Sequence, residues 1–529
     1  MKLQQTFAGL AATIAIAAIA SALTLLWRSH DGLVIERGWL DSTPVTIYRP
    51  GPESSSEQAR SGLEDTDQEL PVVLISHGFA GSQQLMQAFA VTLARHGFLA
   101  VSFDYYGHGR NLEPLTGDVM DIEGATRSLV EQTAAVADFA LALPEAGPGL
   151  AVLGHSMASD IIVRHALSDP RVQATVAVSM FSPAVTADAP RNLLVIVGNL
   201  EGPLKAEALR VVRLINEQAV AGETVGSFSD GSARRAVFAP GVEHVGVLYS
   251  PTALRETVAW LDQVFARNSS GPEAYIDRRG LAIPLLLSGL VLLAWPLSKL
   301  LPRVVDPGRG LNPGWRELWP AALLPAVATP LLLFAFPADF LGVLVGGYLA
   351  VHFAVYGLLT AGFCFWLQRR RGAVARASGR RRPIAALLAA SAATLYAAGA
   401  IGLVFDQFIT SFAVTIPRLP LLLLMLGGTM AYFMADEWLT RGPDVPRAAH
   451  LLTRFCFLLS LGLAVALSFE DLFFLLIIAA VIVPYFLLYG LLSGWVYRAT
   501  GDPLVSALPS AVAFGWTLAV VFPQLLVPA

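Results

Sequence analysis

The sequence predicts two kinds of fold in one chain: an α/β domain with a mostly parallel sheet and helices on both faces, then an all-α multi-span transmembrane domain. Hydrophobic residues make up 55% of the 529 residues and charged residues only 14%, which is outside the usual range of soluble proteins. The apolar residues are also unevenly placed. Residues 30–278 alternate short apolar runs with amphipathic stretches, whereas nearly everything after Gly280 is apolar. The predicted domains are therefore an N-terminal membrane anchor at 1–29, the α/β domain at 30–278 and a polytopic membrane domain at 279–529.

The N-terminal anchor is predicted from the uncharged, mostly apolar run between Phe7 and Trp27. At 1.5 Å per residue this run is long enough for the roughly 30 Å hydrocarbon core of a bilayer. A cleaved signal peptide is the competing interpretation, because the segment is rich in alanine and lies close to Lys2. The run exceeds the apolar core of about 7 to 15 residues that such peptides carry, so an uncleaved anchor is favoured.

Within the α/β domain, short apolar runs alternate with helical patterns. The strands are predicted at 72–76, 98–103, 150–153, 175–179, 193–197 and 235–238. The main helices are predicted at 83–95, at 121–143, after 154–159 as far as about 167, and at 252–265. Such alternation predicts a largely parallel sheet with a site at the carboxyl ends of its strands. Residues 33–36 and 45–48 predict an antiparallel hairpin at one edge, and the polar, serine-rich, acidic segment from Gly51 to Glu69 predicts a mobile loop.

About eight further spans are predicted after this domain, near 281–301, 318–336, 341–367, 384–404, 419–438, 449–467, 472–493 and 504–526. Arginines concentrate in alternate connections, at 303–316, 369–382, 441–454 and 498, whereas the intervening short connections hold only Arg418. The positive-inside rule then places the arginine-rich connections in the cytoplasm and the α/β domain on the outer face of a bacterial cell (inner) membrane. Arg278 and Arg279 lie on that outer side, at the end of a long translocated domain where the rule is weak.

The segment 154–158, Gly-His-Ser-Met-Ala, lies between a predicted buried strand and a helix, downstream of His77-Gly78. Small residues around Ser156 let a strand turn sharply into a helix and expose the hydroxyl. By this order of motifs, residues 31–268 resemble the α/β-hydrolase superfamily, whose G-x-S-x-G pattern has alanine at Ala158 here. The resemblance implies an α/β-hydrolase fold and a serine hydrolase activity.

A serine nucleophile needs a histidine to take its proton and an acid to hold the imidazole in the right tautomer. The resemblance implies that the acid is Glu201, just past the strand at 193–197, and that the base is His244, after the last strand. Asn199 is a local alternative that cannot ionise, and Asp230 is a more distant one.

The same resemblance implies an oxyanion hole formed by two backbone N–H groups, those of Phe79 and Met157. The loop from Asp104 to Arg110 is expected to brace the turn beside the pocket rather than take part in the chemistry. No cofactor is predicted, and no metal, because no histidine or carboxylate cluster has ligand spacing. Both cysteines, Cys364 and Cys456, fall within predicted spans, so the α/β domain has no thiol nucleophile.

Only about eleven residues separate two strands at the place where many relatives insert a helical lid, so the site is expected to be open. The expected partners are the lipid bilayer and an amphiphilic or small acyl substrate, with hydrolysis of an acyl ester as the leading reaction. A peptidase of the same fold is the alternative. Nucleic-acid binding is not expected, since the basic clusters lie between apolar spans, and the sequence sets no oligomeric state.

A function of a different class is a transporter or sensor whose α/β domain only binds a ligand. Ionisable residues inside membrane spans are often functional. His352 lies in mid-span, and Asp406, Asp436 and Glu437 lie near predicted span ends. The plain interpretation is that His352 is hydrogen-bonded between helices and that the three acids sit at the membrane interface. A full set of nucleophile, base and acid in the α/β domain argues against a purely binding role.

Overall fold

The structure is a computed structural model that describes residues 2–51, 69–118, 121–267, 275–337, 340–371 and 380–526. Except for its two end residues, the mobile loop predicted from Gly51 to Glu69 lies outside the described residues. The chain divides into two compact units: the sheet unit, at 20–286 and 407–411, and the helical unit, at 1–19, 287–406 and 412–529. The long N-terminal helix α1 (Lys2–Arg28) and helix α8 (Arg279–Ser298) each contribute residues to both units.

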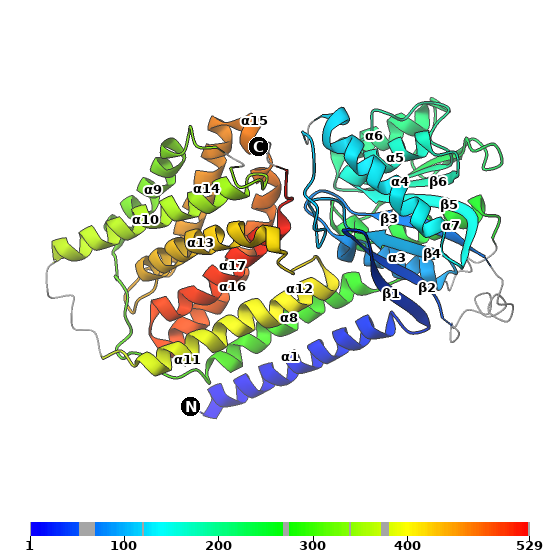
Figure 1. Cartoon of the computed structure of the whole chain (residues 1–529). Coiled ribbons are helices and arrows are strands. Elements are labelled where there is room, and N and C mark those ends of the chain that lie inside the picture. The colour runs from blue at the N-terminus through cyan, green and yellow to red at the C-terminus, as the bar shows by residue number, and fades with distance from the viewer. Residues whose placement is uncertain are drawn as a thin grey trace. The chain divides into compact units, whose positions relative to one another are not determined.

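The sheet unit is built on a nine-stranded sheet with the order β1-β2-β4-β3-β5-β6-β7-β9-β8 (Figure 1). Its strands are β1 (Leu33–Leu40), β2 (Thr43–Pro50), β3 (Leu70–Ser76), β4 (Leu99–Phe103), β5 (Ala146–His155), β6 (Val172–Val178), β7 (Leu193–Gly198), β8 (Thr224–Val225) and β9 (Arg234–Ala239). Six adjacent strands run parallel: β4, β3, β5, β6, β7 and β9. The β1–β2 hairpin adds an antiparallel edge beside β4, and β8 adds one beside β9. The predicted parallel sheet with a hairpin at one edge is confirmed.

Helices cover both faces of this sheet. They are α3 (Gln87–Arg95), α4 (Arg127–Leu141), α5 (Met157–Ser168), α6 (Gly202–Arg213) and α7 (Pro251–Val264). On one face Phe89 of α3 and Trp260 of α7 pack on β3, β5 and β6, and on the other Val163 of α5 and Val212 of α6 pack on β6 and β7. The central strands β4 and β7 are buried along their whole length because helices cover both faces of the sheet.

The helical unit continues after α8 with helices that are mostly long and apolar. They are α9 (Trp315–Leu332), α10 (Gly346–Arg371), α11 (Pro383–Thr394), α12 (Ile401–Phe408), α13 (Leu419–Thr440), α14 (Ala449–Leu467), α15 (Phe469–Leu472), α16 (Leu475–Thr500) and α17 (Pro503–Val521). A π-helical turn at Leu395–Ala400 joins α11 to α12. Gly357 and Gly428 let α10 and α13 pack at close range, because a Cβ at either position would come within 2.4 Å of the facing backbone.

Eight helices of the described chain are long and apolar enough to cross a membrane, α1 among them. The span predicted at 318–336 corresponds to α9, which is not one of the eight. Its first turn carries Arg316 and Glu317, and it contains three prolines, so its apolar character is weaker.

The arginine-bearing connections of the helical unit lie together at one end. Arg371, at the end of α10, donates from Nη1 to the carbonyl oxygen of Leu311, 2.7 Å away, and Arg303 donates to the carbonyl oxygen of Arg498 at 3.1 Å. The segment that follows α8 therefore neighbours the ends of α10 and α16. Because α9 and α10 are consecutive and both have their arginine-bearing ends here, they run through the unit in opposite directions.

Two of the acids predicted near a span end are buried inside the helical unit. Asp436 and Glu437, near the end of α13, are 2% and 0% exposed. Glu437 pairs with Arg441 at 3.0 Å and accepts hydrogen bonds from Ser493 and Ser506 at 2.8 and 2.9 Å. The sequence placed these acids near a span end but could not show that α16 and α17 pack against them.

Two other ionisable residues of this unit have local partners. Buried His352 of α10 shares a hydrogen bond of 3.1 Å with the hydroxyl of Ser460 on α14, as the interhelical interpretation predicts. Asp406 accepts a hydrogen bond of 2.8 Å from the backbone N–H of Phe412.

Candidate active site

Ser156 lies in a strained turn between β5 and α5. Its backbone has φ 55° and ψ −118°, a region that costs a non-glycine residue conformational energy. The turn is held because the Ser156 N–H donates to the carbonyl oxygen of Val178 at 2.8 Å. A Cβ on Gly154 would lie 2.7 Å from the carbonyl oxygen of Ala158, so the two small residues allow strand and helix to meet. Alanine at 158 is thus compatible with the turn.

Three side chains form a continuous hydrogen-bonded chain at the carboxyl ends of the strands. The hydroxyl of Ser156 lies 2.8 Å from Nε2 of His244, and Nδ1 of His244 lies 2.6 Å from Oε1 of Glu201. These distances suit a serine that donates to a histidine, which in turn donates to a carboxylate. The structure therefore brings together the three residues that the sequence analysis singled out as nucleophile, base and acid.

Glu201 is held as a carboxylate by donors on both of its oxygens. Its Oε2 accepts hydrogen bonds from the hydroxyl of Ser179 at 2.8 Å and from the backbone N–H of Gly198 at 2.6 Å. Burial raises the pKa of Glu201, but the hydrogen bonds from His244, Ser179 and Gly198 outweigh it, and the pKa lies below its ordinary value of 4.5. The acid is therefore charged at neutral pH.

Neither alternative acid belongs to this chain of hydrogen bonds. The side chain of Asn199 accepts a hydrogen bond from Lys205, and Asp230 accepts one from the backbone N–H of Ser232 in an exposed turn.

Two residues that sequence reasoning did not assign to the site help to hold it. Nε2 of His155 donates to the carbonyl oxygen of His244 at 2.8 Å, and the two rings lie 4.8 Å apart. Burial is the main reason that the pKa of His155 falls to about 3, so its ring is neutral. Ser179, the donor to Glu201, directly follows β6 in a left-handed conformation, φ 53°. The only sequence signal for either residue is its place at the end of a strand.

The two predicted backbone donors lie on the loop and the helix that flank Ser156. Met157 is the first residue of α5, where a backbone N–H has no partner within its own helix. Phe79 follows Gly78, and a Cβ on Gly78 would lie 3.0 Å from Cβ of Ser156, so this loop passes close to the nucleophile.

The loop at 104–111 is braced by Asp104. Its carboxylate accepts hydrogen bonds from the backbone N–H groups of Gln83 at 2.7 Å and Arg110 at 2.9 Å. Buried His77 links the same loop to the turn before Phe79, because it donates to the carbonyl oxygen of Gly78 and accepts from the N–H of Tyr105. Asp104 thus joins separate backbone segments and does not reach the three aligned side chains.

The site is accessible to solvent. The side chain of His244 is 43% exposed, and Ser156 is half-buried. Phe181, Leu200 and Val245 are exposed apolar residues on three loops that also carry Ser179, Glu201 and His244. No helix lies between β6 and β7.

A family model described as serine aminopeptidase, S33, matches residues 67–220. The match includes Ser156 and Glu201 and ends before His244. The match lies within the sheet unit, whose mostly parallel sheet and flanking helices form an α/β-hydrolase fold.

Several solved structures resemble this α/β-hydrolase domain at low identity. A predicted CIB-like hydrolase from Thermoplasma acidophilum is 15% identical, covers 44% of this chain and 99% of its own, and has a TM-score of 0.32. A putative dienelactone hydrolase from Klebsiella pneumoniae subsp. pneumoniae MGH 78578 is 16% identical, and the alignment covers 45% of this chain and 99% of the hydrolase, with a TM-score of 0.32. A membrane phospholipase A is 16% identical, and the alignment covers 50% of this chain and 96% of the phospholipase, with a TM-score of 0.32. No curated protein matches the sequence.

Within the described residues, no group of three or more His, Cys, Asp and Glu side chains is placed to hold a metal ion.

Proposed function

We propose that the protein is a membrane-bound serine hydrolase that cleaves an acyl ester through a Ser156–His244–Glu201 triad and an acyl-enzyme intermediate. The observation that carries the proposal is the unbroken chain of hydrogen bonds from Ser156 through His244 to Glu201. A hydroxyl in a strained strand-to-helix turn with such partners is the arrangement by which a weak nucleophile is activated.

In the first half of the reaction, the Ser156 hydroxyl oxygen attacks the ester carbonyl and its proton passes to Nε2 of His244. The backbone N–H groups of Phe79 and Met157 are the proposed donors to the oxyanion, and losing one such donor typically costs about 100- to 1,000-fold in turnover. The tetrahedral intermediate collapses as His244 returns the proton to the leaving alcohol. Water then attacks the acyl-enzyme with His244 as base, and the acid product leaves with Ser156 regenerated.

An ester is favoured over a peptide as substrate. An aminopeptidase, the activity in the name of the matching family model, needs a carboxylate to bind the free amino group of its substrate. The acids closest in sequence to the triad already have partners: Glu243 accepts from the N–H groups of Val245 and Gly246, and Asp160 pairs with Arg164 at 2.7 Å. The exposed apolar side chains beside the triad suit an acyl chain or an amphiphile.

The proposal is tested by covalent labelling of the membrane fraction with a fluorophosphonate probe. We expect wild type to be labelled and both Ser156→Ala and His244→Ala to lose labelling. Simple acyl esters and aminoacyl amides are then compared as substrates, and turnover of amides alone would favour the peptidase. A well-folded wild type that resists the probe would instead favour a domain that only binds its ligand.

We further propose that the protein lies in a bacterial cell membrane with the hydrolase domain on the outer face. The grouping of the arginine-bearing segments at one end of the helical unit supports this orientation under the positive-inside rule. Arg279, which would count against it, is buried and pairs with Asp277 at 2.8 Å, so its charge is part of the folded domain.

Single-cysteine labelling in intact spheroplasts tests the orientation. Cys364 and Cys456 are buried, so the wild-type background should be low. A membrane-impermeant maleimide should label exposed Glu217→Cys in the hydrolase domain at once, and exposed Arg316→Cys only after permeabilisation. The opposite pattern would place the domain in the cytoplasm.

A further inference from the structure

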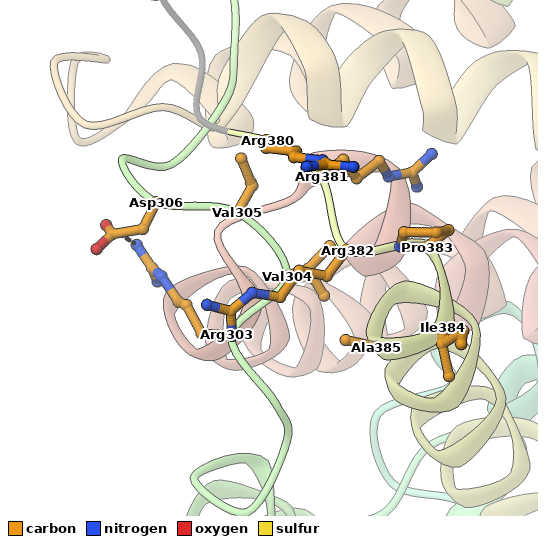
Figure 2. A pocket seen from close by; sticks show the side chains of 10 residues that line it. All are labelled: Arg303, Val304, Val305, Asp306, Arg380, Arg381, Arg382, Pro383, Ile384 and Ala385. Carbon is orange, nitrogen blue, oxygen red and sulfur yellow. Dashed lines mark hydrogen bonds and ion pairs between the residues drawn. The ribbon is translucent and has the colours of Figure 1, made fainter.

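An arginine-rich cavity of about 560 Å³ opens in the helical unit, between the segment that follows α8 and the start of α11 (Figure 2). Arg303 and Asp306 come from the first segment, and Arg380, Arg381 and Arg382 from the second. The backbone joins the two segments, because the N–H of Arg382 donates to the carbonyl oxygen of Val304 at 3.0 Å. We call this cavity the arginine pocket. Its volume falls within the roughly 300–1,000 Å³ typical of small-molecule sites.

Two of the four arginines are held in place by the protein. Arg303 lies 3.3 Å from Asp306 and donates to the carbonyl oxygen of Arg498, and Arg381 pairs at 2.7 Å with Asp502, which is buried. These contacts fix the walls of the pocket and leave a surplus of positive charge, since four guanidinium groups face two carboxylates.

The other two arginines, Arg380 and Arg382, differ from these within the described part of the chain. Among the described residues, the side chains of Arg380 and Arg382 have no hydrogen-bond or ion-pair partner, and both are exposed. A guanidinium group offers five N–H donors in a planar fork that matches the oxygens of a phosphate. The arginine pocket is therefore complementary to a phosphate-bearing anion.

A second cavity, of about 490 Å³, lies along α8 and α11 and is lined almost wholly by apolar atoms. We call it the apolar groove. Leu300 and Leu388 line it and are 79% and 61% exposed, and Trp495 of α16 closes one side. Leu301 in the groove is only two residues from Arg303, and Leu388 lies one helical turn beyond Ile384, which lines the arginine pocket. Charged and apolar surfaces therefore adjoin in one site.

We propose that the arginine pocket and the apolar groove together bind one anionic phospholipid, with its phosphate among Arg303, Arg380 and Arg382 and an acyl chain along Leu300 and Leu388. A soluble phosphate would use the arginines but would leave the groove empty, so the adjoining apolar surface favours a lipid. Basic pockets between membrane helices are suited to anionic headgroups on the cytoplasmic side, which is where the positive-inside rule places these arginines. The site is separate from the triad and does not depend on the proposed hydrolysis.

The test measures lipid retained by the purified full-length protein after equilibration with mixed phosphatidylglycerol and phosphatidylcholine, read by native mass spectrometry. Wild type should retain phosphatidylglycerol selectively. Arg380→Gln combined with Arg382→Gln should lower that selectivity by about 25-fold. Each arginine close to an anionic headgroup contributes about fivefold to binding, and two such contributions multiply. The matched control is Arg316→Gln combined with Arg447→Gln, which removes two exposed arginines elsewhere on the described helical unit and should change selectivity less than twofold.

A second pair of measurements separates a lipid from a soluble anion. Ala392→Phe places a ring in the apolar groove and should reduce retention of phosphatidylglycerol while the arginines remain intact. Glycerol phosphate, which carries the headgroup chemistry without acyl chains, should compete poorly with the lipid. Competition by glycerol phosphate as strong as that of the lipid would overturn the proposal in favour of a soluble anion. The proposal would also be overturned if Arg316→Gln combined with Arg447→Gln lowered the selectivity for phosphatidylglycerol as much as Arg380→Gln combined with Arg382→Gln does. Unchanged selectivity in the Arg380 and Arg382 double variant would overturn it as well. Unfolding temperature in detergent verifies that each variant is folded.

Discussion

Replacing Glu201 with glutamine should disable the triad while nearly preserving its shape. The carboxylate oxygen Oε2 accepts hydrogen bonds from the N–H of Gly198 and the hydroxyl of Ser179, and Oε1 accepts from Nδ1 of His244. The backbone N–H of Gly198 can only donate. A glutamine that satisfies it must direct its carbonyl oxygen to Gly198, and its NH2 group then faces His244.

An NH2 group beside Nδ1 favours the imidazole tautomer that has its proton on Nε2. That proton points at Ser156, so His244 can no longer take the serine proton. In a serine-protease triad, the equivalent change from aspartate to asparagine lowers kcat by about 10,000-fold, which corresponds to about 5.4 kcal/mol. If the glutamine flips instead, two donors face each other at Gly198, at a cost of about 1–3 kcal/mol, and only a small fraction of molecules keeps the active tautomer. A flip that costs about 1 kcal/mol would leave about a fifth of the activity, so we expect a loss of about 5- to 10,000-fold in kcat.

The assay is hydrolysis of a short-chain nitrophenyl ester, or the rate of fluorophosphonate labelling, in detergent-solubilised full-length protein. Asp230→Asn is the matched control, because it makes the same acid-to-amide change at the alternative acid. Asp230 lies in an exposed turn, where substitutions have small effects, so the rate should stay within about twofold of wild type. A Glu201→Gln protein with more than half of wild-type activity, or an equal loss in Asp230→Asn, would refute the assignment of the acid.

Two further predictions concern charge and stability. The pKa of Glu201 lies below 4.5 in the folded protein, so this group stabilises the fold above pH 4.5 and that contribution is lost as the pH falls through the folded pKa. The free energy of unfolding of wild type relative to Glu201→Gln should therefore shrink in acid, and denaturant titrations that show it growing would contradict the hydrogen-bond pattern. In the helical unit, Glu437→Gln leaves Arg441 without its buried partner and should destabilise the protein by about 3–5 kcal/mol. Exposed Glu470→Gln should have little effect on the same thermal unfolding in detergent.

Local features of the fold followed from local sequence patterns. The strand predicted at 193–197 is β7, and the span predicted at 449–467 is α14, because buried strands and spans are continuous apolar runs that any window of sequence reveals. Element ends were less accurate: β5 begins at Ala146, where the sequence predicted Leu150, since glycine and proline at 147–149 resemble a turn.

The candidate site needed both kinds of information. Ser156 stands out because the turn requires small neighbours that are adjacent in the chain, whereas Glu201 and His244 were placed by a family's order of motifs. Ser179 and His155 gave no comparable signal, because their role lies in hydrogen bonds to residues 22 and 89 positions away.

The sequence by itself determined the two kinds of domain, the order of strands and helices along the chain, and the candidate serine in its strand-to-helix turn, since these are properties of neighbouring residues. Only the tertiary structure decided which distant groups meet: the hydroxyl of Ser156 with His244, the carboxylate of Glu437 with Ser493 and Ser506, and Arg303 with the segment before α11. Such contacts depend on how the strands order themselves in the sheet and how the helices pack, and no local pattern encodes those arrangements.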